Sequence, residues 1–114
     1  VQSFGTDWPA AAYLSTWKPL TQIEVAVTRR LPGRRDLPAR NLGQALSVAQ
    51  AVHGLTRASA WQLGVENELG SLDVGKRADL VMLDRDIFRI DPFTIAAGQA
   101  VLVMVGGWTV RDAR

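Results

Sequence analysis

The stretch GSLDVGKRADLVMLD, residues 70–84, decides the fold of the second half of the chain. Its last seven residues, ADLVMLD, place an apolar run between aspartates, which predicts a strand buried on both faces. Further along, Gly106 and Gly107 separate the apolar run at 101–105 from a second short run at 108–110. Two glycines supply the positive φ angles of a tight turn, so these runs predict a β-hairpin.

The same stretch also imitates a phosphate-binding loop. Residues 70–77, GSLDVGKR, satisfy that pattern up to the last position, where Arg77 replaces the required Ser or Thr. A phosphate loop follows a strand and opens a helix, whereas this segment leads into a predicted strand. We therefore interpret Gly70 and Gly75 as turn residues, with Lys76 and Arg77 on the solvent side of the strand entrance.

Upstream, the apolar spacing is helical. Pro19 is expected to open a short helix that Pro32 and Gly33 end. Asn41 and Gln44 have capping-box spacing, and the residues after them form one apolar stripe, which predicts a helix that starts at residue 41 and continues to about residue 52. A third short helix is expected after Thr56, ending at Gly64 and carrying Trp61 in the core. Trp108 of the hairpin is also expected in the core.

Composition limits the class of protein. The chain has 114 residues, of which 47% are hydrophobic, so we expect one small folded domain or a piece of a larger one. No apolar run approaches the roughly 18 residues of a membrane span, and we expect a soluble protein without a membrane partner, with a cytoplasmic location favoured. There is no cysteine, and the net charge is +2. The chain begins with Val1 rather than Met, which suggests processing or a fragment.

The start of the chain carries a single carboxylate on a turn. Residues 4–9 read FGTDWP, and residues 1–4 are expected to end a short strand. Gly5 would let the backbone turn into a loop that carries Asp7 and Trp8. From this position alone, Asp7 is expected to cap the turn, as aspartate often does.

These motifs together resemble the metal-dependent amidohydrolases. GSLDVGKRADLVMLD is similar to their hallmark near the C-terminus, and FGTDWP is similar to the end of their last barrel strand. The segments PL..I..AVTR and LDRDIFRIDP resemble the subgroup that contains N-substituted formamide deformylase and YtcJ-like proteins. The resemblance implies an α/β fragment. Residues 1–67 would be the last strand and helices of a (β/α)8 barrel, and residues 68–114 the C-terminal strands of the accompanying small β-sandwich.

The resemblance also implies a reaction. Asp7 would lie at the carboxyl end of the eighth strand and ligate a divalent metal, which the resemblance implies is zinc. It would transfer a proton during hydrolysis of a non-peptide carbon–nitrogen (amide-type) bond of a small molecule. Trp8 would lie at the barrel mouth, where it either contacts substrate or packs beneath the adjoining loop.

The chain departs from the family pattern at the metal ligands. The family needs several histidines, and this chain has only His53. We therefore expect the 114 residues alone to bind no metal and to be inactive, with the remainder of the parent barrel or another copy of the chain as partner. The alternative is a non-catalytic binding or regulatory module on the same scaffold. Five arginines between Arg29 and Arg40 are interpreted as a solvated loop rather than a nucleic-acid site.

Overall fold

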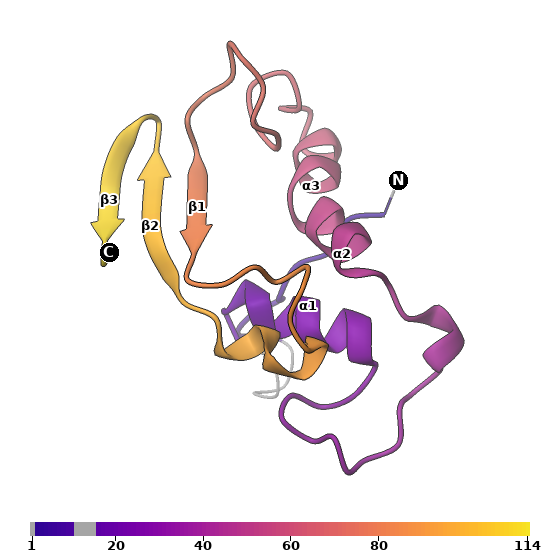
Figure 1. Cartoon of the computed structure of the whole chain (residues 1–114). Coiled ribbons are helices and arrows are strands. Elements are labelled where there is room, and N and C mark those ends of the chain that lie inside the picture. Colours follow the sequence, from indigo (N-terminus) through magenta and orange to yellow (C-terminus); the bar gives the residue numbers. More distant parts are fainter. Residues whose placement is uncertain (1, 11–15) are drawn as a thin grey trace.

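The computed structural model describes residues 2–10 and 16–114 of the chain (Figure 1). Within this described part of the chain, three α-helices lie beside a three-stranded antiparallel sheet of order β1-β2-β3, and two short 3₁₀ helices lie in the connections. The elements are α1 (Pro19–Thr28), η1 (Leu42–Gln44), α2 (Val48–Leu55), α3 (Arg57–Gln62), β1 (Leu80–Leu83), η2 (Pro92–Ala97), β2 (Ala100–Val105) and β3 (Trp108–Asp112). The three α-helices thus precede the three strands in the sequence, and η2 lies between β1 and β2.

Helix α1 begins and ends where the sequence predicts. Pro19 occupies the first turn, where its missing N–H costs no helical hydrogen bond. Arg29 adopts a left-handed conformation with φ 55° and caps the C-terminus, so the helix stops before Pro32 and Gly33. The prediction of a short helix opened by Pro19 is confirmed.

Helix α2 starts later than predicted. Asn41 has φ 50° and leads only into the 3₁₀ turn η1, so it is not an N-cap of the α-helix. The real capping box is Ser47 with Gln50, in which the hydroxyl of Ser47 accepts from the Gln50 N–H and the Gln50 side chain accepts from the Ser47 N–H. The N–H of Leu46 donates to the carbonyl of Ala26 in α1 at 3.0 Å, so it does not form a hydrogen bond within a helix that begins at residue 41. The predicted helix start at residue 41 is therefore wrong.

Helix α3 follows α2 after a sharp corner at Thr56. The helix lies where the sequence predicts it, and Gly64, with φ 71°, follows its end. The Thr56 hydroxyl donates back to the carbonyl of Val52 rather than capping α3. Trp61 is 55% exposed and Trp108 is 80% exposed, so the prediction that both belong to the core is wrong.

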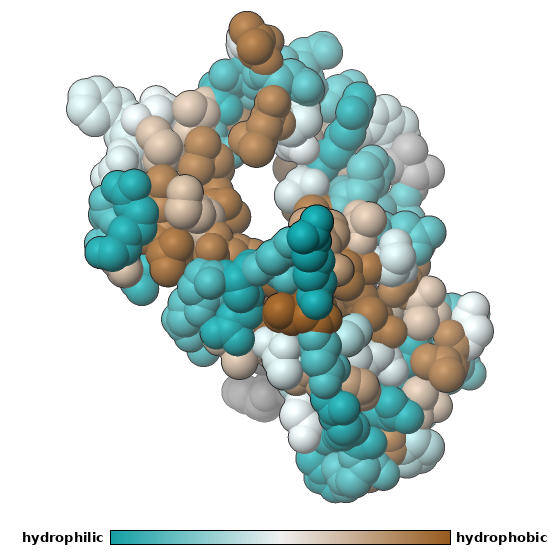
Figure 2. Space-filling view, in the orientation of Figure 1, coloured by the Kyte–Doolittle hydropathy of each residue, from teal (hydrophilic) through white to brown (hydrophobic). Residues whose placement is uncertain are grey.

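The sheet confirms the predicted hairpin but not the predicted burial. Gly106 and Gly107 connect β2 to β3 with φ angles of 57° and 86°. In β1, however, Val81 is 56% and Met82 46% exposed, so the strand is not buried on both faces. The reason is that only the Leu83 end of β1 reaches the hydrophobic core, and Figure 2 shows hydrophobic side chains uncovered on the sheet.

The core lies between the helices and the segment that connects β1 to β2. Its buried members are Ile23 of α1, Ala51 of α2, Ile87 and Ile95. Ile95 belongs to η2, which packs along α1 (Figure 1). The isoleucines of residues 84–95, DRDIFRIDPFTI, pack at this core, while Phe88 is 60% exposed.

The turn before β1 is closed by Lys76 rather than opened to solvent. Its ammonium donates to the carbonyl of Glu66 at 2.5 Å and to the hydroxyl of Ser71 at 2.6 Å, and its side chain is only 15% exposed. The expectation that Lys76 lies on the solvent side is therefore wrong. This lysine satisfies two acceptors of its own loop, which explains its place in the turn without a phosphate ligand.

The described start of the chain does not form the predicted strand. Residues 2–7 form no strand, although residues 1–4 were expected to end one, and Val1 itself lies outside the described residues. A strand needs a neighbouring strand to satisfy its backbone N–H and carbonyl groups. The described sheet consists of β1, β2 and β3 and does not include residues 2–7. Among the described residues, no helix is long and apolar enough to cross a membrane.

Candidate functional site

Asp7 lies on an exposed turn at the end of the extended N-terminal segment. Its φ of 50° is in the left-handed region, which aspartate tolerates better than most residues but still at a cost. The next residue, Trp8, is 57% exposed, and its N–H donates to the hydroxyl of Thr6 at 3.3 Å. The turn thus presents a carboxylate and an indole side by side in sequence, both open to solvent.

The segment before Asp7 is held by α2 and α3. Phe4 packs against the hydrophobic core and lies over Gly54 of α2, so closely that a Cβ at Gly54 would be 2.5 Å from the Phe4 ring. The hydroxyl of Ser3 donates to the side-chain carbonyl of Gln62 at the end of α3. Asp7 therefore follows three residues after an anchored aromatic side chain, and Gly54 is the residue that admits this anchor.

The described residues do not fit a complete metal site. Among residues 2–10 and 16–114, no group of three or more His, Cys, Asp or Glu side chains is placed to hold a metal ion. His53 is exposed on α2, where it borders a surface hollow with Gln2, Phe4 and Gln50. A single exposed carboxylate holds a divalent ion poorly, so Asp7 would need further ligands to take part in metal chemistry.

The arginine-rich loop after α1 is not a free basic patch. Arg34 pairs with Asp36 of the same loop at 2.7 Å, and Arg35 pairs with Asp91. The Arg35 guanidinium, together with the N–H of Phe93, holds the pKa of the Asp91 carboxyl below its usual value. These two arginines are thus engaged in ion pairs within the fold.

One buried carboxylate was not predicted from the sequence. Glu24 of α1 is only 1% exposed, and it accepts from the N–H of Ala96 at 2.9 Å and from the N–H of Gly33 at 3.4 Å. The signal was present, because Glu24 lies four residues after Leu20 and three before Val27, on the apolar stripe of the helix. A charged residue on that stripe indicates a buried hydrogen-bonding role.

Comparison with known proteins places these features in a family. The model of the amidohydrolase family matches residues 1–111, nearly the whole chain. The chain belongs to the amidohydrolase family. Its hallmark turn, the strand that follows and the Asp7 turn all lie within the matched range.

Several curated proteins are similar to parts of this amidohydrolase chain. A 5′-deoxyadenosine deaminase of Methanobrevibacter smithii is 33% identical over 67 residues, covering 59% of this chain and 15% of the relative. A 5-methylthioadenosine/S-adenosylhomocysteine deaminase of Symbiobacterium thermophilum is 35% identical over 71 residues, covering 54% and 16%. An imidazolonepropionase of Rubrobacter xylanophilus is 34% identical over 77 residues, covering 68% and 18%. The matched part is thus less than a fifth of each relative, and no solved structure matches the chain.

Proposed function

We propose that these residues are the C-terminal part of a metal-dependent hydrolase that acts on a non-peptide carbon–nitrogen bond of a small molecule. The observation that carries the proposal is the family match over residues 1–111, which includes the exposed Asp7 turn. Residues 1–67 would contribute the last strand and helices of a (β/α)8 barrel, and residues 68–114 strands of a β-sandwich. The subgroup we propose is that of N-substituted formamide deformylase and YtcJ-like proteins, on the segments PL..I..AVTR and LDRDIFRIDP.

Asp7 is the proposed proton-transfer residue. Its carboxylate is exposed on a turn held by the anchored Phe4, so it can take a proton from an attacking water and return it to the leaving nitrogen. A divalent metal, for which we propose zinc, would be held by Asp7 only together with histidines outside these 114 residues. Trp8, which is 57% exposed, is the proposed substrate-contacting residue beside it.

The uncovered sheet has room for a further layer. Val81, Val105 and Trp108 are each about half exposed or more, at 56%, 48% and 80%. Complete burial of a fully exposed apolar side chain of this size contributes about 1.5–3 kcal/mol, so each of these partly exposed side chains would add a fraction of that value under a further layer. We propose that the remainder of the parent protein, or another copy of the chain, supplies that layer.

The relatives favour a second candidate reaction in the same class. Two of the similar proteins are named as deaminases and another as an imidazolonepropionase. Deamination is therefore the second candidate for the complete enzyme. A non-catalytic binding module on the same scaffold is the alternative from a different class.

The test is Asp7→Asn in the complete enzyme, assayed on N-formyl amines, cyclic amides and amino-substituted purine nucleosides with zinc present. We expect kcat/KM to fall by roughly 10²–10⁴-fold while the circular dichroism spectrum is unchanged. The matched control is Asp112→Asn, which removes an exposed carboxylate of β3 that pairs with Arg114. A fully active Asp7→Asn enzyme would remove Asp7 from the mechanism, and absence of activity in the complete parent with all substrate classes would favour the binding module.

A further inference from the structure

Residues 29–40 form a loop whose two ends are tied together. The N–H of Arg40 donates to the carbonyl of Arg29 at 2.8 Å, and the Arg29 side chain donates back to the carbonyl of Arg40 at 3.0 Å. Within the loop, the Arg30 side chain donates to the carbonyl of Leu37 at 2.7 Å. Closed ends and internal packing by its own side chains are the features of an Ω-loop, a compact surface unit.

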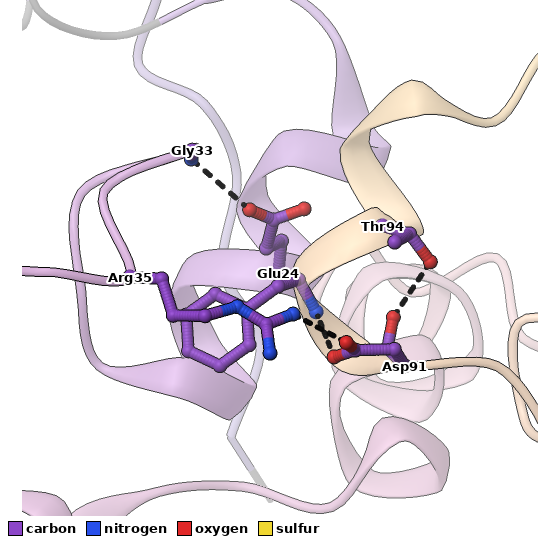
Figure 3. A network of polar contacts seen from close by, with 6 residues as sticks. Glu24, Gly33, Arg35, Asp91 and Thr94 are labelled. Carbon is purple, nitrogen blue, oxygen red and sulfur yellow. Dashed lines mark hydrogen bonds and ion pairs between the residues drawn. The ribbon is translucent and has the colours of Figure 1, made fainter.

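This Ω-loop is docked on η2 and α1 by a few polar contacts. Arg35 pairs with Asp91, and its guanidinium lies 4.3 Å from the centroid of the Phe93 ring. The N–H of Gly33 donates to Glu24 of α1 at 3.4 Å (Figure 3). The Arg35 and Asp91 side chains are 61% and 45% exposed. Contacts between exposed charges are individually weak and are screened by salt.

The residue beneath the loop is a buried carboxylate. Glu24 is 1% exposed, and one of its oxygens accepts from the Ala96 N–H of η2 at 2.9 Å. The other oxygen has the longer contact, to Gly33 of the loop. If the loop lifts, Glu24 keeps its bond to η2 and exchanges the Gly33 N–H for water, which a carboxylate accepts readily.

We propose that residues 29–40 are a lid that opens as a preassembled unit and uncovers Glu24. The ties between Arg29 and Arg40 are the fixed base, and the contacts of Arg35 with Asp91 and Phe93 are the clasp. Opening breaks the clasp, the Gly33 contact and the contact of the Arg30 guanidinium with the Phe93 ring, whose centroid is 5.5 Å away. It leaves the internal hydrogen bonds of the loop in place. This lid is independent of the proposed reaction, because none of its contacts includes Asp7.

The test measures access to Glu24 in the intact protein. Carbodiimide with glycinamide labels accessible carboxyl groups, and mass spectrometry of peptides gives the labelling rate of Glu24. Removing the clasp with Arg35→Met is expected to raise that rate by roughly three- to thirtyfold, because an exposed ion pair and a cation–π contact are lost together. In the unchanged protein, raising sodium chloride from about 0.1 M to about 1 M shortens the Debye length from about 10 Å to about 3 Å and should raise the rate in the same direction.

The matched control is Arg34→Met, which removes the neighbouring arginine, whose ion pair with Asp36 lies within the loop. We expect it to leave the labelling of Glu24 unchanged. Hydrogen exchange of the Arg40 N–H, at the base, should be the same in Arg35→Met as in the unchanged protein. Equal labelling rates of Glu24 in the unchanged protein, Arg35→Met and Arg34→Met would overturn the lid. Faster hydrogen exchange of the Arg40 N–H in Arg35→Met would overturn it as well, because the loop would then unfold instead of moving as a unit. If Arg35→Met does not fold, the salt series decides: a rate that does not rise with salt overturns the proposal.

Discussion

The turn before β1 contains two glycines whose replacement by alanine should have very different costs. Gly70 and Gly75 have nearly the same backbone, with φ angles of 90° and 92°. A side chain in this region costs about 1–2 kcal/mol for either residue. The surroundings differ, because a Cβ at Gly70 would lie 2.6 Å from the Cβ of Ala60 and 3.1 Å from the Cα of Arg57, whereas a Cβ at Gly75 meets nothing within 4 Å.

The expected loss in the free energy of unfolding is the sum of the backbone cost of a positive φ and the cost of steric overlap. Gly75→Ala should lose only the backbone term, whereas Gly70→Ala should lose a further 1–3 kcal/mol or so for overpacking against α3, giving about 2–5 kcal/mol in total. Urea unfolding followed by far-ultraviolet circular dichroism gives the free energy of unfolding of both variants. In a double-mutant cycle, Gly70→Ala should cost less in the Ala60→Gly background than in the unchanged protein, because Ala60→Gly removes the nearest contact. The cycle is needed because Ala60→Gly by itself costs about 1 kcal/mol of helix propensity. Equal unfolding free energies for the two single variants, within about 0.5 kcal/mol, would refute the packing of Gly70 against α3.

Two further perturbations test the N-terminal anchor and the sheet. Gly54→Ala should lower the free energy of unfolding by about 1–2 kcal/mol, although alanine has the better helix propensity, because its Cβ would lie 2.5 Å from the Phe4 ring. The control is Gly43→Ala, whose Cβ would meet nothing within 4 Å. Thermal denaturation should show this control variant to be nearly neutral. The Arg85 guanidinium, together with the Gln99 N–H, lowers the pKa of Asp84 from 3.8 to about 2. This carboxylate therefore stabilises the fold above about pH 4, and the contribution is lost as the pH falls towards 2. An NMR titration of the Asp84 carboxyl checks the value, and Asp84→Asn should weaken the loss of stability over that interval; an acid unfolding curve that the substitution does not change would contradict the assignment.

Local chemistry made most of the elements predictable from sequence. Pro19 fixes the start of α1, and the two glycines at 106 and 107 fix the hairpin, because each acts within a few residues of the backbone it controls. The start of α2 was missed because Asn41 and Ser47 both precede a glutamine at capping-box spacing. The choice between them depends on the contact of Leu46 with Ala26, which is twenty residues away in sequence and is not visible in a local pattern.

Burial was less predictable than secondary structure. The apolar run of β1 predicts a strand correctly, but an apolar run is buried only if another layer covers it. Val81 and Trp108 are exposed because the described helices contact the sheet at the Leu83 end and not along its faces. The composition of a strand therefore reports the surface that it can bury, and the surrounding layers decide whether that surface is buried.

Only the part of the candidate site that lies in a sequence motif could be predicted. Asp7 was singled out by its neighbours in FGTDWP, and it lies exposed with a left-handed φ of 50°. Its catalytic role stays a prediction. Glu24 was missed because an apolar stripe was read for its hydrophobic members alone. Its partners, Gly33 and Ala96, come from two separate segments that only the folded chain brings together.

The polar groups of the turn before β1 and the carboxylate of Asp7 have different environments. In the turn, Lys76 is committed to the Glu66 carbonyl and the Ser71 hydroxyl, and Gly70 is packed against α3. Asp7 instead lies exposed on its turn. Substitutions in the turn should therefore change stability while leaving substrate preference unaltered, since the polar groups there are satisfied by the fold. Substitutions at Asp7 should instead lower the activity of the complete enzyme and leave stability nearly unchanged, because an exposed carboxylate contributes little to folding and is available for proton transfer.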